Sequence, residues 1–313
     1  MLFRHTRQSL TVLAPAKLNL FLRIVGKRPD GFHDLESVMA TIGVYDTLEL
    51  TEVDSSEIEL SVADSSPRTA SGSMRLEAPA GPENLVIRAA NLLRERTGCR
   101  HGARITLIKR IPSSAGLGGG SSDCAAALAG LNRLWNLRLS RPELLTLAGE
   151  LGSDVAFFLA DAPLAVCTGR GERIEPLRVS SRLHFVVAKP ASGLSTPAVF
   201  REWSSASGNH SGAKPLQSET PTVASFVESL TRHDVGATAR RLHNGLQAPA
   251  EALNADVRWL SNLFQRLPVI GHQMSGSGSS YFGMCASRRQ ALAVSSRLRA
   301  AGVPWVRAVR SCP

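Results

Sequence analysis

Residues 111–127 read IPSSAGLGGGSSDCAAA, and this stretch predicts a strand end, a phosphate-binding loop and the start of a helix. In the ten residues after Pro112, Leu117 is the only bulky side chain. The glycines let the backbone adopt positive φ and approach an anion, and the helix directs the positive end of its dipole there. A flexible linker is the alternative, but the following residues 128–135 have helical spacing. We therefore expect an oxyanion, most simply a phosphate, at this loop.

Several other phosphate and catalytic motifs are missing from the chain. The loop does not satisfy GxxxxGK[ST] or GxGxxG, and no HExxH, CxxC or GxSxG occurs elsewhere. P-loop NTPase, dinucleotide-binding, metalloprotease, zinc-finger and hydrolase readings therefore have little support.

The composition indicates a soluble globular protein. A length of 313 residues favours about two domains, and no apolar run is long enough to span a bilayer. The N-terminal residues 1–13 lack the apolar core of a signal peptide. An odd number of scattered cysteines without metal-ligand spacing favours a reducing compartment, so we expect the cytoplasm. They are Cys99, Cys124, Cys167, Cys285 and Cys312.

The formal net charge of +10 would attract polyanions, nucleotides included. Nucleic-acid binding is therefore an alternative function. Against it, the basic residues are dispersed, aromatics make up 5% of the chain, and no RNA- or DNA-binding signature occurs.

Residues 10–27 alternate as a strand does, which places Lys17 and Asn19 on one face. A lysine in such a run commonly guards an edge strand against aggregation. The asparagine on the same face and the preceding Pro15-Ala16 favour a functional lysine.

Two further segments carry candidate chemistry. Pro29-Asp30-Gly31 predicts a turn that presents Phe32 and His33, either as ordinary loop residues or as a stacking platform beside a hydrogen-bonding imidazole. Asp154, in the sequence LGSDVAFF at 151–158, is either a first-turn acid of a short helix capped by Ser153 or a carboxylate fixed at the rim of the core. Phosphoryl transfer to an alcohol needs such a group near the attacking hydroxyl.

The remaining pattern mixes strands and helices. We expect residues 47–53 and 57–62 to pair as strands around a turn at 54–56, and residues 202–222 to form a polar surface insertion or linker. The SGSGSS segment at 275–280 is either a hairpin turn or a second backbone approach to a substrate phosphate. Other expected helices cover 84–96, a segment from the loop to about 135, one from 140, stretches within 223–267, and 287–301; other strands cover 103–111, the hairpin 165–176, 183–188 and 305–310.

Five segments in this order, PAKLNLFL, PDGFHDLESVM, IPSSAGLGGGSSD, LGSDVAFF and MSGSGSSYF, resemble the GHMP kinase superfamily over nearly the whole chain. The full set looks like the branch that phosphorylates 4-diphosphocytidyl-2-C-methyl-D-erythritol in the non-mevalonate isoprenoid pathway. The resemblance implies an α+β, two-domain GHMP kinase fold. Residues 1–178 would form a ribosomal-S5-like, ATP-binding N-terminal domain, and residues 179–313 an α/β, substrate-side C-terminal domain.

The resemblance also implies roles for individual residues. Lys17 and Asp154 would be catalytic, ATP would be the phosphoryl donor with Mg²⁺ on unknown ligands, and the acceptor would be a small molecule, without nucleic acid or membrane. The oligomeric state stays open between monomer and weak dimer. The implied ATP-binding residues are Pro112, Ser113, Ser114, Ala115, Gly116, Leu117, Gly118, Gly119, Gly120, Ser121, Ser122, Asn84 and Lys109; the implied substrate-binding residues are Asn19, Phe32, His33, Thr196, Phe200, Ser275, Gly276, Ser277 and Gly278.

Five residues depart from the family pattern at these segments: Ser113 and Ser114 replace smaller or apolar residues, Cys124 replaces an alanine, and the other two are Ala156 and Phe32. Ala156 stands where proline is usual, and Phe32 stands where tyrosine is common, which keeps stacking and loses a phenol hydrogen bond. A superfamily kinase with another acceptor, such as mevalonate, homoserine or a sugar, is the alternative enzyme. An acceptor without a nucleobase would leave Phe32 and His33 nothing to recognise.

Overall fold

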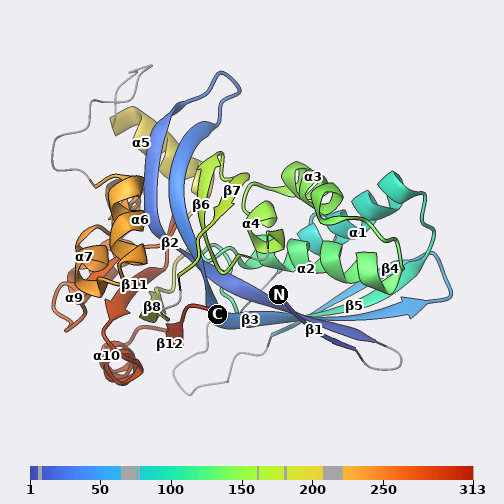
Figure 1. Ribbon diagram of the computed structural model, residues 1–313. Coiled ribbons are helices and arrows are strands. Elements are labelled where there is room, and N and C mark those ends of the chain that lie inside the picture. Colours follow the sequence, from blue (N-terminus) through green and yellow to red (C-terminus); the bar gives the residue numbers. More distant parts are fainter. Residues whose placement is uncertain are drawn as a thin grey trace. The chain divides into compact units, whose positions relative to one another are not determined.

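The structure is a computed structural model that describes residues 1–5, 9–64, 76, 78–160, 162–179, 182–206 and 221–312 (Figure 1). It mixes helices and strands, which confirms the α+β fold class. The strands are β1 Leu2–His5, β2 Leu10–Lys27, β3 His33–Val53, β4 Ile58–Asp64, β5 Gly102–Lys109, β6 Leu164–Gly169, β7 Arg173–Pro176, β8 His184–Lys189, β9 His243–Asn244, β10 Gly271–Met274, β11 Tyr281–Cys285 and β12 Trp305–Arg310. The helices are α1 Leu85–Thr97, α2 Gly119–Leu134, α3 Arg141–Leu151, α4 Val155–Leu159, α5 Thr196–Ala206, α6 Val223–Thr231, α7 Val235–Arg240, α8 Gln247–Leu253, α9 Ala255–Phe264 and α10 Arg288–Ala300.

The chain forms two compact units and passes between them several times. Unit 1 contains residues Met1–Ala16, Val44–Ser113 and Gly118–Ala162, and unit 2 contains Lys17–Gly43, Ser114–Leu117 and Pro163–Pro313. Strands β2 and β3 each contribute to both units, and so does the glycine loop. The sequential domain boundary after residue 178 stays a prediction.

In unit 1, helices α1 to α4 lie on the same side of strands β4 and β5 (Figure 1). The packing of α2 on the strands is close at Gly130, where a Cβ atom would lie 2.4 Å from Leu50 and 3.1 Å from Val12. A Cβ atom at that contact would force Leu50 to shift, because interiors are packed without spare volume. The position of α2 is therefore set by the strands on which it packs.

The predicted hairpin of residues 47–53 and 57–62 is wrong. Strand β5 lies between β3 and β4, antiparallel to β3 and parallel to β4. The burial of the strands explains the order, because β5 buries Ala103, Ile105 and Leu107 whereas alternate residues of β4 are exposed. Gly102 allows the insertion, since a Cβ atom there would lie 2.3 Å from the carbonyl oxygen of Ser55.

Local capping signals define the helix ends in unit 1. Asn84 caps α1 by accepting a hydrogen bond from the amide of Val86, and Gly98 ends the helix in the left-handed conformation at φ 69°. Ser140 and Glu143 form a capping box at the start of α3. These predicted helices are confirmed.

In unit 2, a second sheet has the order β10-β11-β8-β12, and every neighbouring pair is antiparallel. Helices α8, α9 and α10 supply apolar side chains, among them Val257, Leu260, Val294 and Leu298, to one core cluster with β8 and β11. Strand β6 pairs with the first half of β3 and with β7, as the predicted hairpin 165–176 requires. The SGSGSS segment connects the paired strands β10 and β11.

The predicted insertion at 202–222 is partly wrong. Residues 202–206 form the last turns of α5, whose Val199 is fully buried and fixes the helix to the core. Residues 207–220 lie outside the described residues. Among the helices that the structure describes, none has the length and apolar content needed to cross a membrane.

Candidate active site

The glycine loop has a backbone suited to binding an anion. Ser114, Gly116 and Gly118 have positive φ values of 49°, 70° and 68°, and the residues between them, Ala115 and Leu117, do not have positive φ. Alternation of this kind turns successive N–H groups toward one concave side. Gly118 is the N-cap of α2 without a side-chain cap, so the first N–H groups of that helix have no capping side chain. The loop can therefore bind a phosphate through its backbone.

The loop residues on either side of these positions differ in exposure. Pro112, Ala115, Leu117, Gly119 and Ser122 are buried. Ser113, Ser114 and Gly120 are exposed, and Ser121 is intermediate. The buried residues anchor the loop, because Gly119 packs so closely on Ile111 that a Cβ atom would lie 2.9 Å from its side chain.

Beside the first turns of α2, Lys109 lies between two carboxylates. Its ammonium donates to Asp46 at 2.5 Å and to Asp123 at 2.7 Å, and its side chain is 3% exposed. Burial opposes the charge of Lys109, but Asp123 and Asp46 together raise its pKa. Burial raises the pKa of Asp123 to about 7, against the attraction of Lys109. A cation and two carboxylates that share one proton form a neutral buried group.

This Asp46–Lys109–Asp123 cluster connects the end of β5 to α2. Asp46 also accepts hydrogen bonds from the amides of Arg110 at 2.5 Å and Ile111 at 2.9 Å. The cluster therefore ties the residues that enter the loop to the helix that leaves it. Asp46 was not predicted, because it lies 63 residues before Lys109 and has no local motif.

Asn84, a predicted nucleotide-side residue, lies at the N-terminus of α1. Its side-chain oxygen accepts from Val86 at 2.8 Å, and its amide donates to the carbonyl of Pro79. The side chain therefore has a structural role in the helix cap. A contact between Asn84 and a nucleotide stays a prediction.

In unit 2, Lys17 and Asn19 form a buried pair. The Lys17 side chain donates from Nζ to Oδ1 of Asn19, and the residues are 4% and 3% exposed. The side-chain amide of Asn19 donates to the Ser37 hydroxyl at 2.8 Å, and that hydroxyl donates to the carbonyl of Phe21 at 2.8 Å. Since the Ser37 proton is used, Asn19 must present its oxygen to Lys17. Burial of this depth excludes the edge-guard role for Lys17.

Residues 115–117 and the SGSGSS segment meet around this pair. The Lys17 amide donates to the Leu117 carbonyl at 2.9 Å, and Ser275 donates to the Gly116 carbonyl at 3.0 Å. The Ser275 hydroxyl also accepts from the backbone N–H of Asn19 at 3.3 Å. A Cβ atom on Gly276 would lie 3.3 Å from the Lys17 ammonium. The structure therefore brings five predicted residues together: Lys17, Asn19, Gly116, Ser275 and Gly276.

The rest of the SGSGSS segment is fixed by side chains that the sequence did not single out. Asn244 donates to the carbonyls of Met274 at 2.8 Å and Gly276 at 2.9 Å. Gln273 donates to the carbonyl of Asn19 at 2.9 Å. No motif marks these two residues, because their partners are backbone atoms distant in sequence.

Thr196, at the start of α5, pairs with the same segment. Its hydroxyl lies 2.7 Å from the Ser277 hydroxyl. Gly278 has a φ of 85°, and a Cβ atom there would lie 2.7 Å from the sulfur of Met274. Thr196 is thus hydrogen-bonded to the tightly packed loop that contains Ser277 and Gly278.

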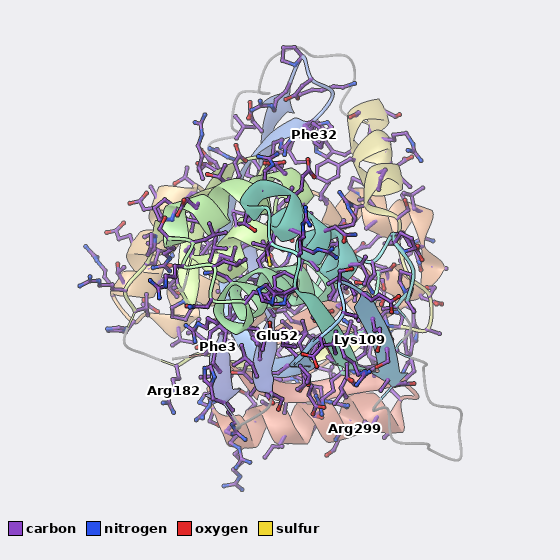
Figure 2. All side chains as sticks on the ribbon, turned by 90° about the vertical axis from the view of Figure 1, so that its right-hand side faces the viewer. Phe3, Phe32, Glu52, Lys109, Arg182 and Arg299 are labelled. Carbon is purple, nitrogen blue, oxygen red and sulfur yellow. The ribbon has the colours of Figure 1, made fainter. Side chains whose placement is uncertain are left out.

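Among the predicted base-binding residues, Phe32 lies between β2 and β3 (Figure 2), His33 begins β3 and Phe200 lies in α5. His33 stacks on Phe200 with ring centroids 5.0 Å apart and meets the edge of Trp203 at 5.4 Å. Phe32 is 51% exposed, and the guanidinium of Arg170 lies 4.3 Å from its ring centroid. Burial, helped by the positive charge of Lys27, lowers the pKa of His33. His33 and Phe200 are therefore brought together, with Arg170 and Trp203 as additional neighbours.

Asp154 belongs to unit 1 and stands at the N-cap of α4, with no side-chain capping bond. Of the two predicted roles, the first-turn acid capped by Ser153 is wrong, because Asp154 itself occupies the cap position. Ala156, where proline is usual in the family, is buried within α4. Lys17 belongs to unit 2, so the pairing of Lys17 with Asp154 stays a prediction.

The donor set around the loop can support one metal contact. Among the described residues, no group of three or more His, Cys, Asp or Glu side chains is arranged to hold a metal. The Ser122 hydroxyl, in the first turn of α2, is buried and has no hydrogen-bond partner among the residues that the structure describes. A hydroxyl oxygen is a hard ligand suited to Mg²⁺, which keeps most of its other ligands as water and substrate phosphates.

Comparison with known proteins gives the family. The description "GHMP kinases N terminal domain" matches residues 84–166, and "GHMP kinases C terminal" matches residues 226–304. The first match contains the glycine loop, α2 and Asp154. The family uses ATP as phosphoryl donor.

Three relatives cover almost the whole chain. The 4-diphosphocytidyl-2-C-methyl-D-erythritol kinase of Bacillus pumilus strain SAFR-032 is 38% identical over 87% of this chain and 86% of its own. The enzyme of the same name from Pelotomaculum thermopropionicum is 38% identical over 93% of this chain and 94% of its own. A crystal structure of 4-(cytidine 5'-diphospho)-2C-methyl-D-erythritol kinase superposes with a TM-score of 0.75 at 33% identity, over 97% of this chain and 100% of that chain.

The two family matches fall on both halves of the chain, and the relatives extend over most of it. The chain belongs to the 4-diphosphocytidyl-2-C-methyl-D-erythritol kinase family of the GHMP kinases.

Proposed function

We propose that this protein transfers the γ-phosphoryl group of ATP to the 2-hydroxyl of 4-diphosphocytidyl-2-C-methyl-D-erythritol, a step of the non-mevalonate isoprenoid precursor pathway. The observation that carries the proposal is the 38% identity, over 93% of this chain, with a kinase whose name gives that substrate. A match of this extent spans most of both chains.

The glycine loop supplies the phosphate contacts in this proposal. Backbone N–H groups at Ser114, Gly116 and Gly118 and the N-terminus of α2 would bind the triphosphate. The Asp46–Lys109–Asp123 cluster would keep the helix N-terminus in place during turnover. The chain then needs no P-loop lysine to bind the nucleotide.

Lys17 and Asp154 would act at the attacking hydroxyl. Asp154 would accept or orient the hydroxyl proton, and the Lys17 ammonium would stabilise charge on the phosphoryl group in transfer. The Asn19 oxygen fixes the ammonium, and the Ser37 hydroxyl fixes Asn19, so Lys17 is positioned before substrate binds. Asn19 would also contact the polar part of the acceptor.

Phe32, His33 and Phe200 would bind the cytosine. Exposed Phe32 offers an aromatic face, and base stacking on such a ring contributes about 1–3 kcal/mol. Thr196 and residues 275–278 would contact the acceptor beside Lys17. Phe32 in place of tyrosine keeps the stacking surface.

Mg²⁺ would accompany ATP, and the Ser122 hydroxyl would be its protein ligand. When bound, the ion neutralises negative charge on the phosphates. Asp46 and Asp123, the carboxylates beside the loop, are bound to Lys109, which fits an ion held mainly by phosphate and water.

Further expectations concern partners and compartment. The five cysteines carry no disulfide and favour the reducing cytoplasm. We expect a small-molecule acceptor and no nucleic-acid partner, because the basic residues form no continuous run. A monomer or weak dimer would carry the complete site.

The test is a coupled ADP-release assay with ATP, Mg²⁺ and four acceptors: 4-diphosphocytidyl-2-C-methyl-D-erythritol, mevalonate, homoserine and galactose. We expect turnover with the first acceptor only, and a new phosphate ester at its tertiary carbon by phosphorus NMR. Turnover with another acceptor and none with the cytidine compound would refute the proposal.

A further inference from the structure

The ring of His33 is held on three sides by α5. Phe200 stacks on its face, Trp203 meets its edge, and the Ser204 hydroxyl lies 3.2 Å from Nε2. These three residues lie within five positions of one helix. The ring plane is therefore fixed by contacts that come from a single rigid element.

The hydrogen bonds of Ser204 determine which nitrogen of His33 carries the proton. The Ser204 hydroxyl donates to the carbonyl of Phe200, one turn earlier in α5, at 3.0 Å. With its one proton on the Phe200 carbonyl, the Ser204 hydroxyl meets Nε2 of His33 as an acceptor. Nε2 of His33 is then the protonated nitrogen.

The other ring nitrogen is consequently an acceptor. A neutral imidazole carries one N–H, which leaves Nδ1 with a lone pair. Burial and the charge of Lys27 disfavour a second proton on this ring. Among the described residues, Nδ1 of His33 has no hydrogen-bond partner.

We propose that Ser204 is a positioning residue that fixes His33 in the Nε2–H tautomer, so that Nδ1 accepts a hydrogen bond from the exocyclic amine of cytosine. This inference rests on the proposed function for the identity of the base. Cytosine presents an amine at position 4, where uracil presents a carbonyl oxygen. Nδ1 accepts from the amine and repels the carbonyl, so Ser204 acts on base selectivity through His33.

The first arm of the test needs no substrate. The full-length protein is labelled with nitrogen-15 at its eight histidines, and His33 is assigned by the loss of its signals in His33→Gln. We expect the nitrogen shifts of His33 to show protonated Nε2 and unprotonated Nδ1. In Ser204→Ala we expect the two tautomers to mix, and in Ser204→Thr, which keeps a hydroxyl, the Nε2–H form to return.

The second arm compares phosphorylation of the cytidine acceptor and its uridine counterpart. We expect Ser204→Ala to reduce the kcat/KM preference for the cytidine form about tenfold, the effect of one hydrogen bond. Ser204→Thr should restore the preference. Ser205→Ala is the matched control, because Ser205 is the next residue of α5, is exposed and should change neither readout.

Each outcome decides the inference. An Nδ1–H tautomer in the unaltered protein, or an unchanged tautomer and preference in Ser204→Ala, would overturn it. If the protein phosphorylates neither acceptor, the proposed function fails while the tautomer measurement still tests the role of Ser204. If turnover is normal and the tautomer is wrong, the inference alone fails.

Discussion

Replacing Lys109 by methionine tests the buried cluster beside the phosphate loop. The substitution keeps side-chain length but leaves Asp46 and Asp123, which are 0% and 4% exposed, without their shared cation. Removing one partner of a buried ion pair costs about 3–5 kcal/mol. Since a domain is stable by about 5–15 kcal/mol, the variant should lose a large part of its free energy of unfolding.

The assay is urea unfolding followed by circular dichroism, with the KM for ATP measured on the folded protein. A second variant, Lys109→Met with Asp123→Asn, should recover part of the lost stability. Asp46 retains the amides of Arg110 and Ile111, whereas Oδ1 of Asp123 is buried without a partner among the described residues. Asp123 is therefore the carboxylate that the missing cation destabilises more.

Arg104→Met is the control on the same strand. Arg104 pairs with Glu59, but the two side chains are 61% and 47% exposed, and exposed pairs contribute about 0–1 kcal/mol. If the free energy of unfolding of Lys109→Met falls by less than about 1 kcal/mol, as in the control, the reasoning is refuted.

Three further predictions follow from single contacts. Gly116→Ala should raise the KM for both substrates and lower the free energy of unfolding. Gly116 has a φ of 70°, and the new Cβ atom would lie 2.0 Å from the carbonyl oxygen of Ser275. Steady-state KM values equal to those of the unaltered protein would contradict this. Phe32→Ala should raise the acceptor KM about tenfold through lost base stacking, with the KM for ATP as internal control; an unmoved acceptor KM would favour an acceptor without a base. The pKa of Asp123 is raised from 3.8 to about 7, so its proton stabilises the folded protein fully below pH 3.8, and this stabilisation is lost as pH rises through about 7. Unfolding titrations across that range should show this loss in the unaltered protein and a flatter profile in Asp123→Asn; equal slopes would refute the assignment.

The sequence predicted the elements whose signals are local. The glycine loop is followed by α2, Asn84 and Gly98 bound α1, and Ser140 and Glu143 start α3. Each depends on residues within one or two turns of each other, so a single sequence contains the whole signal.

The sequence did not predict features that depend on contacts between distant segments. Two neighbouring strand patterns favour a hairpin, but β5 inserts between β3 and β4 because its side chains are the more apolar. The partners of Lys109 and of the SGSGSS segment lie far away in sequence and have no motif. The role of Ser204 requires knowing that α5 packs against the β2–β3 hairpin.

The sequence predicted which residues form the candidate site, and for some of them it also predicted which neighbours they contact. Alternation placed Lys17 and Asn19 on one face, and their hydrogen bond confirms it. The resemblance singled out His33 and Phe200, which stack. The assignment of roles in ATP and acceptor binding stays a prediction.

The most direct test of the account is the rate of phosphoryl transfer in Asp154→Asn under single-turnover conditions, with ATP and 4-diphosphocytidyl-2-C-methyl-D-erythritol. The amide keeps the size of the carboxylate and cannot accept the hydroxyl proton as a base. We expect a rate reduced at least about 100-fold, the contribution of a positioned general base, with binding of both substrates by calorimetry nearly unchanged. A transfer rate equal to that of the unaltered protein would contradict the account.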